Sequence, residues 1–336
     1  MRALKSVLRD AWRLAIPYFR SEERWTARLL LGSIIAMSLL LVQLNVLLNY
    51  WNRAFFDTLQ NKDWPGFLQL LLTWRDGEAG FMPGFVAIVL LYIPVAIYRT
   101  YLNQLLQIRW RRWMANRMTA DYLAGRAYYT MSLQHGPGGA DNPDQRIADD
   151  TKSFVEDTLT LGLGLLSNVV SLSSFAVILY GLSGALSVLG LNVPGYLLWV
   201  AILYAAAGSY LTHLIGRPLA GLEFGQQKAE ADFRFALVRL RENTEGVALL
   251  GGEAQERSGL LARFAAIYAN WIALIKRRKL VNSLIYGYQQ VAGIFPFVVA
   301  SPRYFNGSIT LGGLTQIAGA FGQVQDSLSW FIQSYQ

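Results

Sequence analysis

Long apolar stretches without charged side chains recur along this chain and predict its architecture. No Asp, Glu, Lys, Arg or His occurs at positions 29–52, 79–98, 158–212, 280–302 or 304–325. A helix needs roughly 20 apolar residues to cross a bilayer, so four stretches fit one span each and the third fits two. The pattern therefore predicts six spanning helices, at about 29–50, 84–106, 158–181, 193–214, 281–301 and 310–336.

Two polar segments separate the second span from the third and the fourth from the fifth. They cover residues 109–157 and 217–279, and their apolar positions recur at three- and four-residue steps with few helix breakers. We expect the spanning helices to continue past the bilayer as two long hairpins. The predicted fold class is an all-α membrane protein with six spans and long cytoplasmic extensions.

The first 28 residues predict a separate helix that lies on the membrane surface. An apolar stripe faces a basic stripe: Leu4, Leu8, Trp12, Ile16 and Phe19 against Lys5, Arg9 and Arg13. Such a basic amphipathic helix binds in the interface plane. The segment lacks the continuous apolar core and small-residue cleavage site of a signal peptide. We therefore expect an elbow helix at 1–28, followed by a transmembrane domain at 29–336.

Charge distribution predicts the orientation of the chain. The net charge is +8, but only 15% of the 336 residues are charged and 53% are hydrophobic. Of 30 basic residues, 25 lie in the amino-terminal segment and the two hairpin segments. The positive-inside rule places these segments in the cytoplasm. The charge thus predicts the orientation of a multi-pass membrane protein and argues against a nucleic-acid partner. The location that we expect is a bacterial inner membrane.

Signatures of catalysis and metal binding are missing from the sequence. There is no cysteine, and His135 and His213 are the only histidines, so a metal site is not expected. The phosphate loop, the His-Glu-x-x-His motif and the Gly-x-Ser-x-Gly elbow are also absent. We expect this chain to contain no catalytic residue and to bind no cofactor itself.

Four segments carry a family resemblance that covers nearly the whole chain. They read LNYWNRAFFDTLQNKD (48–63), NPDQRIADD (142–150), EADFRFALVRLRENTEGVALLGGEAQE (230–256) and AFGQVQDSLSWFIQSY (320–335). They resemble ATP-binding-cassette (ABC) transporters of the branch that includes the SbmA/BacA-like transporters and the peroxisomal fatty-acyl (ABCD-type) transporters. The resemblance implies the type IV exporter fold and a homodimer. It also implies a carboxyl-terminal nucleotide-binding domain, missing here, that would bind ATP and Mg.

The resemblance also implies a coupling helix that presses on that nucleotide-binding domain. It follows the break His135-Gly136-Pro137-Gly138-Gly139, with a capped start and a proline at its first position. The coupling residues would be Asn142, Pro143, Asp144, Gln145, Arg146 and Asp149. An ordinary capped turn on a solvated loop is the alternative. A second coupling helix is expected near Leu219–Lys228.

In the second cytoplasmic hairpin we expect side chains that brace neighbouring helices. They are Glu230, Phe233, Arg234, Arg239, Arg241, Glu242 and Glu245. The alternative is a solvated helix with ion pairs from Arg239 to Glu242 and from Arg241 to Glu245, each worth only about 0.2–0.5 kcal/mol.

Polar residues inside the predicted spans are candidates for a substrate cavity. They are Asn45, Asn49, Arg99, Gln323 and Asp326. Ionised groups in the bilayer are costly and usually face a polar cavity or a partner. Hydrogen bonding between helices, and snorkelling of Arg99 and Asp326 to the interface, are the alternatives.

The function expected is the transmembrane part of an ATP-driven half-transporter that works by alternating access. By resemblance, its cargo is a peptide, a bulky cofactor or an acyl-lipid-like compound. The alternatives are a proton-driven SbmA/BacA-like peptide importer without a nucleotide-binding domain, and a membrane scaffold or receptor. Because the sixth span runs into Gln336 without a polar tail, we also expect the natural polypeptide to continue.

Overall fold

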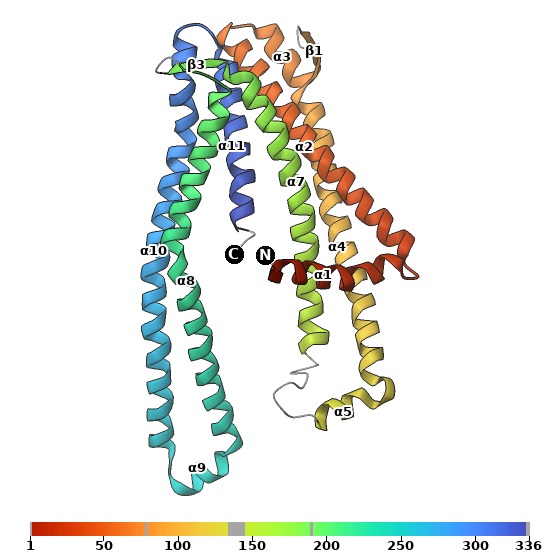
Figure 1. The fold of residues 1–336 in the computed structure, drawn as a ribbon, viewed down its shortest axis with the longest axis vertical. Coiled ribbons are helices and arrows are strands. Elements are labelled where there is room, and N and C mark those ends of the chain that lie inside the picture. The colour runs from red at the N-terminus through yellow and green to blue at the C-terminus, as the bar shows by residue number, and fades with distance from the viewer. Residues whose placement is uncertain (1, 78–79, 134–144, 189–190, 334–336) are drawn as a thin grey trace. The chain divides into compact units, whose positions relative to one another are not determined.

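Helices make up most of the protein (Figure 1). The computed structural model describes residues 2–77, 80–133, 145–188 and 191–333. Contacts group the chain into two compact units, residues 1–198 with 299–336 and residues 199–298.

The first unit contains the transverse helix α1, the helices α2, α4, α7 and α11, and the short elements at their ends. Their bounds are α1 Arg2–Arg20, α2 Arg24–Gln60, α3 Trp64–Leu72, α4 Phe85–Leu123, η1 Ala124–Arg126, α5 Ala127–Leu133, η2 Arg146–Asp150, α7 Thr151–Ser183 and α11 Leu311–Gln333. Two antiparallel hairpins, β1 (Trp74–Gly77) with β2 (Gly80–Pro83) and β3 (Ala185–Val188) with β4 (Leu191–Pro194), lie at the same end of this unit (Figure 1). The glycines and prolines between the third and fourth predicted spans indicate a short turn, where the structure forms the β3–β4 hairpin.

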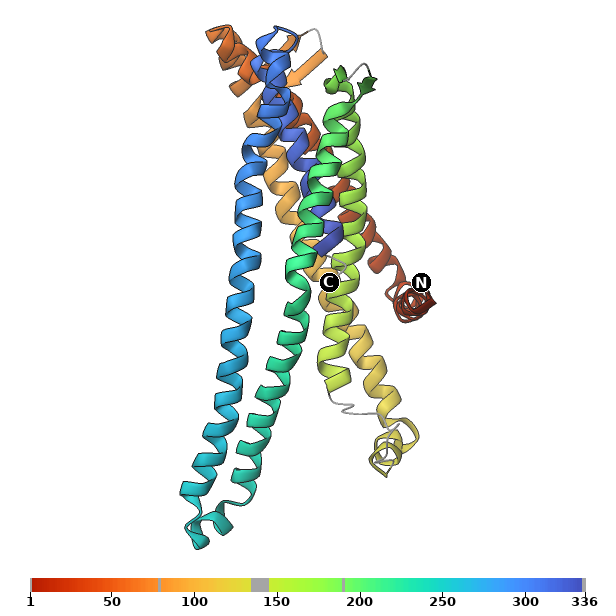
Figure 2. The same ribbon diagram turned by 60° about the vertical axis from the view of Figure 1, so that its left-hand side comes forward.

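The second unit is one long helical hairpin. Its arms belong to α8 (Tyr196–Glu242) and α10 (Glu253–Phe305), which run side by side and are joined by α9 (Thr244–Leu250) (Figure 2). Tyr204 and Tyr288 stack and exchange hydrogen bonds, each hydroxyl donating to the other residue's carbonyl at 2.8 and 3.1 Å. Further along, Asn270 Nδ2 donates to the carbonyl of Leu222 and to Gln226 Oε1, both at 2.9 Å.

Within the described residues, each of the six predicted spans coincides with a helix, apart from a few residues at the span ends. Five helical segments are long and apolar enough to cross a membrane: Arg24–Gln60, Phe85–Met131, Arg146–Ser183, Tyr196–Glu242 and Glu253–Phe305. The sixth predicted span is the 23-residue α11, which is not among those five. The predicted all-α, multi-pass fold is therefore confirmed.

Two local predictions were wrong. A second coupling helix was expected near Leu219–Lys228, but these residues lie inside the continuous helix α8. The short helix of this hairpin is α9. Ser301-Pro302-Arg303 predicts a tight turn, but α10 continues to Phe305 and the chain reverses at Gly307 with φ +78°.

The elbow helix α1 runs transverse to α4 and α7 and buries its last turn (Figure 1). Tyr18 is completely buried, and its ring stacks on Trp110 of α4 with centroids 5.6 Å apart. At the same corner, Arg112 donates to Glu23 Oε1 at 2.7 Å. The elbow is therefore attached to α4 by both aromatic packing and an ion pair.

The buried phenol of Tyr18 predicts a response to alkaline pH. Burial, together with the charge of Glu23, raises the pKa of Tyr18 from 10.0 to about 12, against the opposing effect of Arg109 and Arg112. Between these pH values the folded protein keeps a proton that the unfolded chain releases. The retained proton therefore contributes roughly 2–3 kcal/mol to the free energy of unfolding. This contribution is complete below pH 10 and is lost as the pH rises to about 12. In a titration of phenolate absorbance, the difference between wild type and Tyr18→Phe should have its midpoint near pH 12; a midpoint near 10 would contradict the buried position.

Candidate functional site

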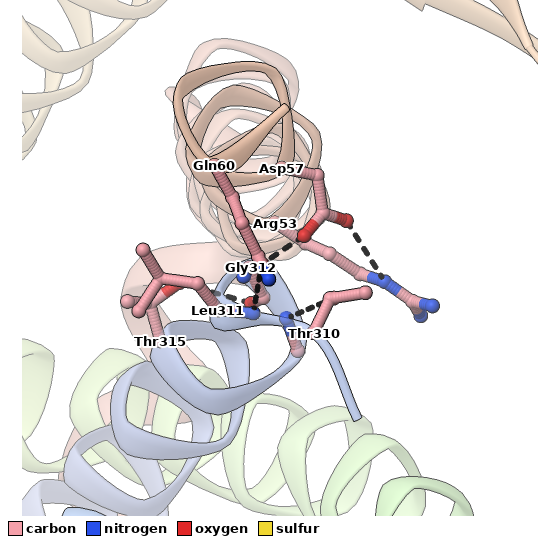
Figure 3. A network of polar contacts seen from close by, with 8 residues as sticks. Arg53, Asp57, Gln60, Thr310, Leu311, Gly312 and Thr315 are labelled. Atoms are coloured by element: carbon pink, nitrogen blue, oxygen red, sulfur yellow. Dashed lines mark hydrogen bonds and ion pairs between the residues drawn. The ribbon is translucent and has the colours of Figure 1, made fainter. Parts of the chain in front are cut away.

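The amino terminus of α11 is capped by side chains of α2, from the other end of the chain (Figure 3). Leu311 N donates to Gln60 Oε1 at 2.7 Å, and Gly312 N donates to Asp57 Oδ1 at 2.9 Å. Thr310 Oγ1 accepts from Gly313 N at 3.1 Å. The first N–H groups of a helix have no partner inside it, so these three bonds satisfy groups that would otherwise need water.

Electrostatics favour the same arrangement. The carboxylate of Asp57 lies at the positive end of the α11 dipole, a placement worth about 0.3–1 kcal/mol at an exposed site. Arg53 Nε is 4.0 Å from Asp57 Oδ2, one helical turn away. The Asp57 side chain is 26% exposed, so water can reach this contact.

Gly312 allows the two backbones to approach closely. A Cβ atom at this position would overlap the carbonyl oxygen of Arg53 and lie 2.5 Å from Asp57 Oδ1. Because the obstacle includes main chain of α2, a rotamer change cannot relieve it. Glycine is therefore required here by close helix approach and not by backbone conformation.

The contact continues along both helices through buried polar groups. Asn49 Nδ2 donates to the carbonyl of Gln316 at 3.1 Å, and a Cβ on Gly319 would lie 3.0 Å from the same Nδ2. Gln316 is completely buried and Asn49 is 6% exposed. Within the described part of the chain, Asn49 Oδ1 and both amide atoms of Gln316 have no hydrogen-bond partner. We name the set Asp57, Gln60, Asn49, Leu311, Gly312 and Gln316 the α2–α11 contact.

The cavity candidates take different positions around this contact. Asn49 belongs to it, whereas Arg99 donates from α4 to Ser38 Oγ of α2 at 2.9 Å. Asn45 and Gln323 are half-buried, and Asp326 is exposed on α11 in this single copy. The structure thus brings Asn49 together with α11 and gives Arg99 a neighbouring helix as its partner.

The predicted coupling residues are only partly described. Asn142, Pro143 and Asp144 lie outside the described residues. Gln145 precedes the short π-helical turn η2, and Gln145, Arg146 and Asp149 are all exposed. Arg111 of α4 donates to the carbonyl of Ala148 at 3.2 Å, which ties this turn to the neighbouring helix.

Among the predicted bracing residues, two contact neighbours in the second unit. Glu230 Oε1 accepts from Gln226 Nε2 at 3.0 Å, and the ring of Phe233 meets Phe264 of α10 edge-on at 5.7 Å. Neither contact involves the other five predicted bracing residues, which are Arg234, Arg239, Arg241, Glu242 and Glu245.

The alternative ion pairs of this hairpin are not formed. Within the described part of the chain, none joins Arg239 to Glu242 or Arg241 to Glu245; the pair in this hairpin joins Arg278 to Glu223 at 3.1 Å. Arg241 and Glu245 do not form the pair expected at four-residue spacing because α8 ends at Glu242, so the two residues do not share a helix.

Sequence reasoning missed most of the α2–α11 contact. Asp57 and Gln60 appeared only within the family motif 48–63, and Gly312 was assigned no role. A signal was present, because Thr310 followed by Leu-Gly-Gly is a typical helix start with an N-cap threonine. The sequence held no sign that the remaining caps come from residues some 250 positions earlier.

A shared fold and a family match together define the class of this protein. A solved structure described as a bacterial Atm1-family ABC exporter with ATP bound matches at a TM-score of 0.63 with 16% identity, covering 92% of this chain and 50% of that one. Residues 14–305 match the family model for ABC transporter transmembrane region 2. The chain therefore belongs to this family of ABC transporter membrane domains.

Curated relatives support the same branch that the four motifs indicated, and the predicted resemblance is confirmed. ABC transporter D family member 2, chloroplastic, from Arabidopsis thaliana is 32% identical over 99% of this chain and 44% of its own length. The inner membrane ABC transporter ATP-binding protein YddA of Escherichia coli is 32% identical over 95% of this chain and 56% of its own length. The human lysosomal cobalamin transporter ABCD4 is 23% identical over 75% of this chain. The chain thus spans about half the length of the first two relatives.

Proposed function

We propose that this membrane domain works in an ATP-driven half-transporter, as a homodimer, with the α2–α11 contact as its closure on the outer side. The chain is an ABC transporter transmembrane region, and the matched exporter has the same fold. Alternating access needs an element with two discrete states whose balance the engine can shift. The α2–α11 contact joins the first and last spans where they meet the outer end, and it has the properties of such an element.

The physical argument is that the contact closes specifically but opens cheaply. Its two cross-helix bonds to backbone N–H groups each contribute about 0.5–1.5 kcal/mol net, because water replaces them when the helices separate. The tight approach at Gly312 makes the closed state a single register. Polar atoms of Asn49 and Gln316 that lack partners when closed gain water when open, which narrows the free-energy gap between the states.

Relatives support the remaining parts of the proposal. Two relatives bear names that include ATP-binding protein or cobalamin transporter, which fits ATP at a nucleotide-binding domain and a bulky cofactor among the cargo classes. Peptides and acyl-lipid-like compounds are the other two classes proposed. The basic segments and the YddA relative favour a bacterial inner membrane with the amino terminus in the cytoplasm. Residues 142–149 would then face the nucleotide-binding domain.

The experiment is ATP hydrolysis and cobalamin uptake by the full-length gene product in lipid vesicles. The variant replaces Asn142, Pro143 and Asp144 by glycine. We expect ATP turnover in the parent, and turnover that no longer drives uptake in the variant, because the coupling helix has lost its cap and its first-turn proline. A triple replacement of Glu253, Ala254 and Gln255 by glycine, at the other hairpin tip, tests whether that tip also couples ATP turnover to uptake.

Two results would count against the proposal. Uptake that follows an imposed proton gradient without ATP turnover would favour the proton-driven importer. Absence of ATP turnover and of uptake of a peptide, cobalamin and a fatty acyl compound would favour the scaffold or receptor.

A further inference from the structure

A small polar cavity lies between α4 and α7, away from the α2–α11 contact. Its volume is about 100 Å³, and it is lined by Gln104, Gln107, Ile108, Arg111, Lys152, Val155 and Glu156. Val155 is 1% exposed and forms an apolar floor, whereas Gln104, Lys152 and Glu156 are exposed at the rim. A water molecule takes up roughly 30 Å³ of liquid, so the cavity accommodates a group of a few heavy atoms.

The polar side chains that line this cavity do not satisfy one another. No side-chain hydrogen bond or ion pair with a described residue is made by four of the lining residues, Gln104, Gln107, Lys152 and Glu156. This holds although Lys152 and Glu156 are four residues apart on one helix. Arg111 is held by the bond from its Nη2 to the carbonyl of Ala148, which orients a guanidinium that carries five N–H donors in all. The lining thus presents two cations, one carboxylate and two amides to a ligand.

The predicted span ends place this cavity at the depth of lipid headgroups. Its residues on α4 begin near the predicted end of the second span at 106, and those on α7 precede the predicted start of the third span at 158. Basic pockets between spanning helices on the cytoplasmic side bind lipid headgroups. The orientation of this boundary toward the cytoplasm rests on the proposed function.

We propose that this cavity binds the headgroup of a phospholipid that carries a phosphate and an ammonium group, as phosphatidylethanolamine does. Arg111 and Lys152 would bind the phosphate, with Gln104 and Gln107 as further donors, and Glu156 would accept from the ammonium. The acyl chains would lie along the apolar surface of α4, where Ile97 and Tyr101 are exposed. A ligand with phosphate alone would leave the Glu156 carboxylate facing a like charge.

Native mass spectrometry of the full-length protein tests this site by counting lipids retained from vesicles that contain phosphatidylethanolamine, phosphatidylglycerol and phosphatidylcholine. Wild type should retain phosphatidylethanolamine in preference to the other two. The double variant Arg111→Gln/Lys152→Gln should retain it about 30-fold less, at about 1 kcal/mol for each basic residue. Glu156→Gln should instead shift the preference toward phosphatidylglycerol. The matched control Lys276→Gln/Lys279→Gln removes two exposed charges from α10 near the predicted inner boundary and should change nothing.

Equal retention by the double variant and the control would overturn the site. Displacement of the bound lipid by inorganic phosphate would also overturn it, in favour of a soluble phosphate compound. Because lipid retention is read without ATP or transport, these outcomes are independent of the proposed function, which the uptake measurements test separately.

Discussion

A short thiol-specific cross-link between Gln60→Cys and Thr310→Cys should stop transport, and reduction should restore it. Gln60 of α2 bonds the backbone next to Thr310, at Leu311 N, at 2.7 Å, so a bifunctional methanethiosulfonate spans this gap in the closed state. The chain has no cysteine, so the two introduced thiols are the only ones it contributes. Holding a two-state element in one state removes the cycle, and we expect a loss of more than about tenfold in transport rate.

The matched control is Lys276→Cys/Lys279→Cys, where the reagent joins two residues of the same helix, α10. It should leave the rate near that of the unmodified protein. ATP turnover is followed in parallel, to separate a blocked outer closure from damage to the engine. Wild-type transport by the protein cross-linked between α2 and α11 would show that these helices do not separate during the cycle, and the proposed closure would be wrong.

The second large effect is expected at Gly312. Glycine-to-alanine replacement inside a helix ordinarily stabilises by about 0.5–1 kcal/mol. At Gly312 the new methyl group would overlap the carbonyl oxygen of Arg53, so we expect the opposite sign and a loss of about 1–3 kcal/mol. Transport should fall as well, because α11 can no longer take its closed register against α2.

Gly322 provides the control on the same helix, since a Cβ there would meet nothing within 4 Å. Thermal unfolding of purified Gly312→Ala and Gly322→Ala measures the contrast. For a protein of this size, each kcal/mol lost from the free energy of unfolding lowers the midpoint of thermal unfolding by about 2–4 °C or less. The midpoint of Gly312→Ala should therefore lie several degrees below that of Gly322→Ala. Equal midpoints would contradict the close approach of the two helices.

Hydropathy and charge were sufficient to predict the fold, because the bilayer restricts what a chain can do. A stretch such as 29–50 has no way to satisfy its backbone in lipid except as a helix. The continuation of the spanning helices into the two long polar segments was also predictable, since the apolar positions there keep the helical period. Boundaries were less accurate: α8 begins at Tyr196, where 193 was predicted, because residues 191–194 pair with 185–188 as strands.

The candidate site was predicted only in fragments. Asn49 was identified as an informative polar residue, because its side chain is costly in a span without a partner. That its partner is the Gln316 carbonyl could not be inferred, since any backbone in the bundle offers the same acceptor. Arg99 shows the same limit, because a polar cavity, a partner and the interface were all open for its guanidinium, and the sequence did not identify Ser38 as the partner it bonds.

By itself, the sequence determined that this protein spans a membrane repeatedly, which segments do so, and to which transporter family it belongs. These properties follow from local composition and from motifs that are contiguous along the chain. Only the tertiary structure decided that Asp57 and Gln60 cap α11, that Gly312 must remain small, and that Arg111 and Lys152 line one cavity. The physical reason is that caps, close approaches and cavities are made between residues distant in sequence, and their geometry depends on how helices pack.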